Sequence, residues 1–129
     1  MSDYTIKRKV ETSFETTIEK LKDELKEEGF GVLTEIDLKE TFKNKLDEDF
    51  NKYNIMGACN PHFAFEGFQS EEDLGVLLPC NVVVYENDAD ETIVAAIDPV
   101  KLLSFSDEEE INRLGEKIKK RFEKVIKNL

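Results

Sequence analysis

The segment 77–86 limits the possible folds more than any other part of the chain, because it contains the run Val82-Val83-Val84-Tyr85. A strand with one face in solvent alternates apolar and polar residues, whereas this run is apolar on both faces. Such a pattern is typical of a central strand. We therefore expect other strands on both sides of it.

Four further segments have strand patterns, and they span residues 4–10, 32–36, 53–59 and 92–97. In the first of these, Tyr4, Ile6 and Val10 share one face, which predicts a half-buried strand. The loop 87–90 joins the central strand to the last one as a hairpin. Pro99 ends that last strand, because proline donates no hydrogen bond and restricts the residue before it.

A first helix is predicted over residues 12–28. Thr12 is the expected N-cap, with Glu15 three residues later as its capping-box partner. Gly29 is placed to end the helix. The apolar stripe between these signals consists of Phe14, Ile18, Leu21 and Leu25.

Two more helices follow from the same reasoning. Asp37 with Glu40 resembles an N-cap pair that opens a short helix, whose apolar residues are Leu38, Phe42 and Leu46. Ser106 with Glu109 caps a long helix over residues 107–128. Glutamates near its start and basic residues toward its end complement the helix dipole.

The element order is strand, helix, strand, short helix, three strands and a long helix. This order predicts an α+β fold with a mostly antiparallel, curved sheet and helices on one face. A chain of 129 residues has the size of one domain, so we expect a single domain over residues 1–129.

The net charge of −11 argues against nucleic acid and anionic membrane surfaces as partners. The first residues lack a basic stretch followed by an apolar run, so we expect no signal peptide. No window has the roughly 20 apolar residues of a membrane span. These features predict a cytoplasmic protein, in which the two cysteines are free thiols rather than a disulfide.

Those two cysteines lie in mirrored motifs, Cys59-Asn60-Pro61 and Pro79-Cys80-Asn81. Each motif stands at the end of a strand-like run. If the two strands are antiparallel neighbours, both thiols lie at one edge of the sheet, within roughly 10 Å. We therefore expect a ligand-binding site formed by these motif residues and the segment between them.

That segment, residues 60–79, is longer than a simple hairpin connection, and loops of such length usually have a function. We expect it to be a loop with one helical turn at residues 70–75. Phe63, Phe65 and Phe68 precede the turn. They either pack beneath the loop as a satellite core or line a pocket beside the thiols.

The sequence is compatible with three interpretations of the cysteines. They are buried packing residues, since cysteine is among the most frequently buried residue types. Alternatively, Cys59 and Cys80 serve a thiol-dependent redox protein or enzyme. A weaker alternative is zinc, bound by Cys59, His62 and Cys80, although strong zinc motifs contain paired ligands. We therefore expect no metal and no other cofactor.

Other catalytic motifs are lacking in the sequence. A single histidine and no Gly-x-Ser-x-Gly elbow make a serine triad hard to assemble. Gly29-Phe30-Gly31 is a helix stop followed by a strand rather than a phosphate-binding loop. Whether the protein is an enzyme is left open by the sequence.

Several segments resemble the family catalogued as domain of unknown function 302. The resemblance runs from about Thr12 to Leu103, and its residues are 29–37, 45–46, 57–61, 74–86 and 97–99. Its most specific part is the motif Leu-Pro-Cys-Asn-Val-Val-Val-Tyr-Glu, which ends at Glu86.

The resemblance implies a TATA-binding-protein-like arrangement of strand, helix, four strands and helix, and a homodimer. It implies no established activity. The matching site positions are Cys59, Asn60, Pro61, Cys80 and Asn81. We expect a small non-catalytic binding module for a small-molecule ligand, with the thiol-dependent protein and the zinc site as alternatives.

Overall fold

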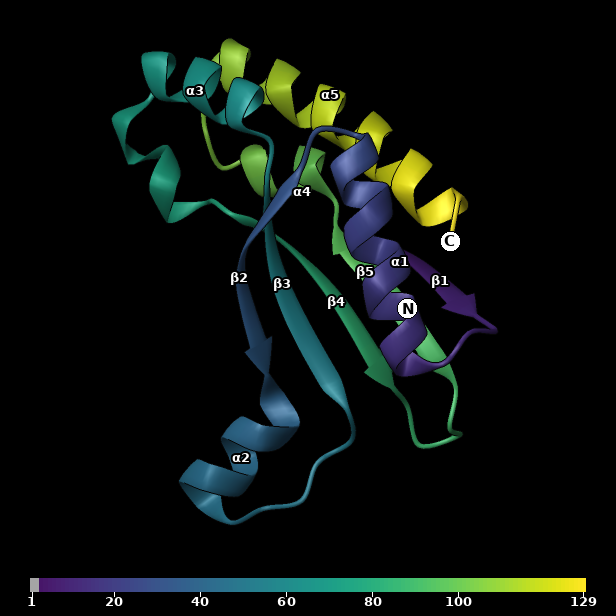
Figure 1. Cartoon of the computed structure of the whole chain (residues 1–129). Coiled ribbons are helices and arrows are strands. Elements are labelled where there is room, and N and C mark those ends of the chain that lie inside the picture. Colours follow the sequence, from purple (N-terminus) through teal and green to yellow (C-terminus); the bar gives the residue numbers. More distant parts are fainter. Residues whose placement is uncertain (1–2) are drawn as a thin grey trace.

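The structure is a computed structural model that describes residues 3–129. Five strands form one antiparallel sheet in the order β1-β5-β4-β3-β2 (Figure 1). Their bounds are β1 Thr5–Val10, β2 Gly31–Asp37, β3 Tyr53–Cys59, β4 Cys80–Glu86 and β5 Thr92–Ile97. The predicted α+β class and antiparallel sheet are therefore confirmed, with β4 in the centre.

The two faces of β4 meet different surroundings. Val82 and Val84 face the helices and are almost fully buried, as is Met56 on the neighbouring β3. Val83 and Tyr85 lie on the opposite face, where they are half-buried. We call this second surface the open face. The apolar character of the central run on both sides thus reflects two apolar surfaces, of which helices cover only one.

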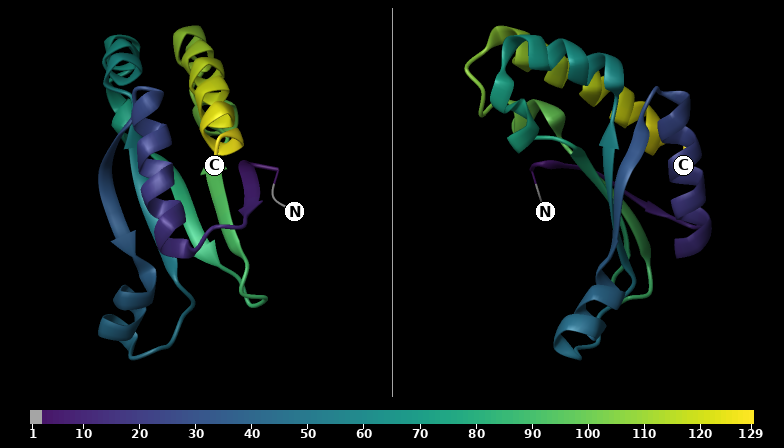
Figure 2. Two further views of the ribbon diagram at one scale, coloured as in Figure 1. Left: turned by 45° about the vertical axis from the view of Figure 1, so that its right-hand side comes forward. Right: turned by 60° about the vertical axis from the view of Figure 1, so that its left-hand side comes forward.

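The helices α1, Phe14–Glu27, and α5, Glu109–Lys127, cover one face of the sheet (Figure 2). The predicted cap of α1 is one residue too early: Ser13, not Thr12, accepts the backbone N–H of Thr16. Thr12 instead lies within hydrogen-bonding distance of the buried hydroxyl of Thr17. Gly29 does end this helix region, with φ of 86°.

The helix α5 also begins later than predicted. Its N-cap is Glu108, and the Ser106 hydroxyl accepts the backbone N–H of Glu108 ahead of the helix. The helix buries an apolar stripe that includes Ile111, Leu114 and Phe122. This stripe supplies much of the core between α5 and the sheet.

The prediction of a loop over residues 60–79 is wrong for residues 61–70, whereas the helical turn expected at residues 70–75 overlaps a 3₁₀ helix. The segment contains the ten-residue helix α3, Pro61–Ser70, and the 3₁₀ helix η1, Glu72–Val76. A further short helix, α4, spans Pro99–Leu103. Both α3 and α4 begin with an Asx-Pro pair, in which the Asx side chain caps the helix and proline occupies its first turn. The sequence patterns alone predict only that these pairs end the preceding strands.

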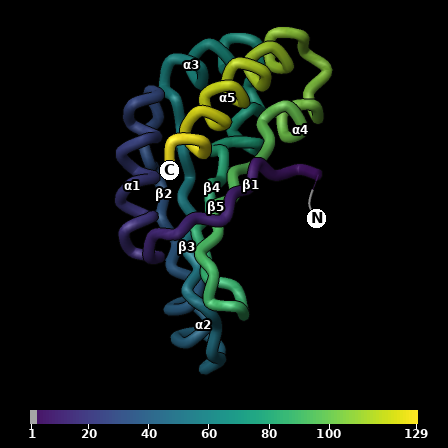
Figure 3. Tube along the Cα trace, turned by 90° about the vertical axis from the view of Figure 1, so that its right-hand side faces the viewer, coloured from purple at the N-terminus to yellow at the C-terminus, as the bar shows by residue number. Residues whose placement is uncertain are grey.

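The helix α2, Leu38–Leu46, has no buried residue and extends beyond the end of the sheet (Figure 3). The predicted cap is confirmed, since the Asp37 carboxylate accepts the backbone N–H of Glu40 at 3.0 Å. Among residues 3–129, no helix is long and apolar enough to cross a membrane.

Candidate functional site

The strand register brings the two cysteines together. Ala58 on β3 is directly opposite Cys80 on β4, so Cys59 lies one residue beyond that pair. Strand spacing and rise then place the two cysteine Cα atoms roughly 6 Å apart. Neither cysteine is in a disulfide. The expected placement at one edge of the sheet and the expected free thiols are both confirmed.

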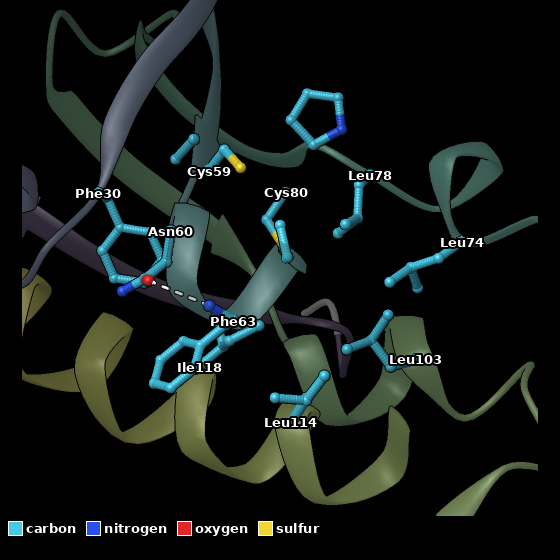
Figure 4. A pocket seen from close by; sticks show the side chains of 13 residues that line it. Phe30, Cys59, Asn60, Phe63, Leu74, Leu78, Cys80, Leu103, Leu114 and Ile118 are labelled. Atoms are coloured by element: carbon cyan, nitrogen blue, oxygen red, sulfur yellow. Dashed lines mark hydrogen bonds between the residues drawn. The ribbon is translucent and has the colours of Figure 1, made fainter. Parts of the chain in front are cut away.

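Both cysteines line one small cavity between the end of the sheet, α3, η1 and α5 (Figure 4). We call it the inner cavity. Its walls are almost wholly apolar and include Phe30, Phe63, Leu74 and Ile118. The space open to a water-sized sphere is about 20 Å³, which suffices for about one water molecule.

Asn60 fixes one wall of the inner cavity. Its Oδ1 accepts the backbone N–H of Phe63 at 3.3 Å and so caps α3, while its Nδ2 donates to the Glu28 carbonyl at 3.4 Å. The Arg121 guanidinium donates to the same carbonyl at 2.9 Å and lies 5.2 Å from the centre of the Phe63 ring. Asn60 therefore joins α3 to the end of α1 and is itself buried.

The surroundings of both thiols disfavour the charged form. Burial, followed by the nearby Cys59, raises the pKa of Cys80 from 9.0 to about 12. Burial also raises the pKa of Cys59. A reactive cysteine needs the opposite shift, which a nearby cation or a helix N-terminus produces. Both thiols are therefore protonated at neutral pH.

The weak zinc candidates do not assemble. His62 is exposed on α3, whereas Cys80 is buried at the end of β4. Within residues 3–129 no three His, Cys, Asp or Glu side chains form a group that could hold a metal ion. The structure thus provides no ligand set for the zinc alternative.

The predicted site residues divide between two sides of the sheet. Cys59, Asn60 and Cys80 line the inner cavity, whereas Pro61 is exposed at the start of α3. Asn81 faces the other way and lines a hollow on the open face. Of the three phenylalanines, Phe63 lines the cavity, whereas Phe65 and Phe68 are 72% and 42% exposed.

Several cavity residues are missed by sequence reasoning because they come from distant parts of the chain. Phe30 follows α1, Leu103 ends α4, and Leu114 and Ile118 lie on α5. Phe30 directly precedes β2, and the other three are apolar residues on the buried sides of helices. For Leu114 and Ile118 the available signal is the helical periodicity, which predicts burial but not which cavity a side chain lines.

The fold and the cavity define an α+β domain with a thiol-containing apolar cavity at one end of its antiparallel sheet. A family model described as domain of unknown function DUF302 matches residues 6–129, and the chain belongs to this family. The crystal structure of an uncharacterized conserved DUF302 protein from Bacillus stearothermophilus is similar, with 28% sequence identity and a TM-score of 0.90. The match covers 98% of each chain. A search of curated proteins finds no match.

Proposed function

We propose that this protein is a non-catalytic binding module whose site lies at the Cys59/Cys80 end of the sheet and the segment 60–79. The observation that carries this proposal is the inner cavity itself, in which both thiols lie among apolar side chains that raise their pKa. Protonated thiols act as small apolar groups with weak hydrogen-bonding capacity. They suit an apolar ligand better than nucleophilic chemistry.

A ligand requires the cavity to widen, because a site for a small molecule measures roughly 300 Å³ or more. We propose that the segment 60–79 is the part of the wall that moves. Its outer side is exposed at Phe65 and Val76, by 72% and 85%. Outward movement of α3 and η1 would enlarge the cavity without disturbing the sheet.

Native mass spectrometry of the protein purified without denaturation tests this function. We expect a co-purifying apolar molecule, and we expect Ala64→Met to remove it, because Ala64 lines the cavity and the longer side chain fills it. The control is Gln69→Met, which adds the same side chain at an exposed position of the same helix. Retention by the Ala64 variant, or no bound molecule in any preparation, would refute the proposal.

The alternative of a thiol-dependent redox protein has one observation in its favour. The register places the Cα atoms of Cys59 and Cys80 within the range of disulfides. However, burial raises the pKa of both thiols, which disfavours the thiolate that such chemistry needs. Rapid alkylation of either cysteine in the folded protein at neutral pH would favour this alternative over the binding module.

We propose a homodimer formed through β2, which is an edge strand. This strand exposes the apolar residues Leu33 and Ile36 by 66% and 45%, a combination that invites pairing with another chain. Light scattering should give twice the monomer mass of 14.9 kDa. Leu33→Lys should lower that mass, whereas Val76→Lys, on η1, should not. A wild-type mass near the monomer at micromolar concentration would contradict the proposal.

We also propose the TATA-binding-protein-like arrangement and a cytoplasmic location. The order β1, α1, β2 to β5 and α5 supports the arrangement, with α2, α3, η1 and α4 as insertions. The two unbridged cysteines suit a reducing compartment. If superposition on a protein of the TATA-binding-protein-like fold shows a different strand order, the proposed arrangement is refuted. Recovery of the native protein outside the cytoplasm would refute the proposed location.

A further inference from the structure

The open face of the sheet contains a hollow that is separate from the inner cavity. The hollow measures about 500 Å³, within the usual range for small-molecule sites. The sequence contains three tyrosines, and all three line it: Tyr4, Tyr53 and Tyr85. None of the nine phenylalanines of the chain lines it. Aromatic rings with a hydroxyl group are thus concentrated at this one surface.

Two of the tyrosines form a stacked aromatic pair. The rings of Tyr53 and Tyr85 are stacked, with centroids 5.1 Å apart and planes only 7° from parallel. Phe50 extends this pair toward α2, its ring centroid 6.1 Å from that of Tyr53. Val83 and Ile97 complete an apolar floor. The outer faces and edges of the stacked rings, together with this apolar floor, fit a planar, apolar ligand body.

The polar groups of the hollow favour an anion. Lys7 is its single charged lining residue, although the chain as a whole carries a net charge of −11. Among residues 3–129, no ion pair or side-chain hydrogen bond uses the Lys7 ammonium or the exposed amide of Asn81. Within the described part of the chain, the buried hydroxyl of Thr5 also has no hydrogen-bond partner. All three groups can donate hydrogen bonds.

We propose that the hollow on the open face binds a small planar aromatic anion. Its ring lies against Tyr53 and Tyr85, and its acidic group is bound by the Lys7 ammonium and the Asn81 amide. The Tyr53 hydroxyl can donate as well, because burial, together with the neighbouring Tyr85 and Tyr4, raises its pKa. This site does not depend on the inner cavity, from which β4 separates it, and pairing through β2 would leave it open.

Titration with 2-naphthoate tests the site, and 2-naphthalenemethanol is the uncharged control with the same ring system. Protein labelled with ¹⁵N-tyrosine has three amide signals, all from residues that line the hollow. Labelling with ¹⁵N-phenylalanine reports on the inner cavity through Phe30 and Phe63. We expect naphthoate to shift the tyrosine signals while Phe30 and Phe63 stay unchanged.

Two lysine variants isolate the role of charge. Lys7→Met keeps the length of the side chain, and we expect it to weaken naphthoate binding roughly three- to fivefold, the effect of one exposed ion pair. Lys9→Met is the control, because Lys9 lies on the same strand face but is paired with Glu91 at 3.1 Å. Binding of the uncharged alcohol should change in neither variant.

Three results would overturn the proposal. The first is equal affinity of the wild type and the Lys7 variant for naphthoate. The second is a response confined to Phe30 and Phe63, which would place the ligand in the inner cavity. The third is no response together with a dimer in which the tyrosine amides are protected from exchange, which would show that a second copy covers the open face.

Discussion

Raising the pH should unfold this protein partly through a single buried thiol. Cys80 is 2% exposed, and burial, followed by the proximity of Cys59, raises its pKa from 9.0 to about 12. In the unfolded chain the same thiol is solvated and loses its proton at lower pH. The folded state therefore binds the thiol proton more strongly than the unfolded chain does. Ionisation of Cys80 thus opposes folding.

The sign and size follow from this difference in pKa. A group whose folded pKa is raised contributes stability that is fully present below the unfolded pKa and is lost as the pH rises through the folded pKa. The affected range is thus about pH 9 to 12. One pKa unit corresponds to about 1.4 kcal/mol, so between about pH 8 and about pH 10.5 Cys80 alone should lower the free energy of unfolding by about 2 kcal/mol.

Urea denaturation of the wild type and Cys80→Ala at both pH values measures this contribution. Other groups that titrate in this range do so in both proteins and cancel in the comparison. The wild type should therefore lose about 2 kcal/mol more than the variant. Cys59→Ala is the matched control, and it should keep most of the wild-type pH dependence, because Cys59 is only half-buried. Equal losses in the wild type and Cys80→Ala would refute the reasoning.

Three further substitutions test the structure around both sites by urea denaturation. Asn60→Ala should lower the free energy of unfolding by about 1–2 kcal/mol, because it removes the cap of α3 and a buried hydrogen bond; no loss would contradict this role. Gly57→Ala should cost about 1–3 kcal/mol, since its Cβ would lie 2.6 Å from Cγ of Pro79, whereas Gly31→Ala, with open space around it, should be tolerated. Asp98→Asn should cost less than Asp98→Ala, because the amide keeps the cap of α4 and loses only the ion pair with α5; equal costs would show that the cap contributes nothing.

The strands could be predicted from the sequence because their patterns are local. The predicted bounds 53–59 and 92–97 are those of β3 and β5. The helix α3 was missed because the Asn60-Pro61 pair has two meanings. Proline ends a strand, but after an Asx residue it also begins a helix, and the choice depends on whether later residues pack. Here Gly67 and Leu74 do so, against α5 and each other.

The site could be predicted only in part for a related reason. The mirrored motifs correctly brought Cys59 and Cys80 to one end of the sheet, because antiparallel pairing of neighbouring strands puts the end of one beside the start of the next. The closeness of Leu103, Leu114 and Ile118 depends on how α4 and α5 cross that end, which periodicity does not specify. The tyrosine hollow was not predicted, because Tyr53 lies on β3, Tyr85 on β4 and Tyr4 directly before β1, and the register of these strands was unknown.

The motif Pro79-Cys80-Asn81 acts as the boundary between the two sites. Successive side chains of a strand point to opposite faces, so Cys80 lines the inner cavity and Asn81 the hollow on the open face. The two sites should therefore respond to separate substitutions. Asn81→Ala should weaken naphthoate binding but keep the alkaline loss of about 2 kcal/mol, and Cys80→Ala should do the reverse. If Cys80→Ala weakens naphthoate binding as much as Asn81→Ala, the sheet does not separate the sites, and movement of β4 couples them.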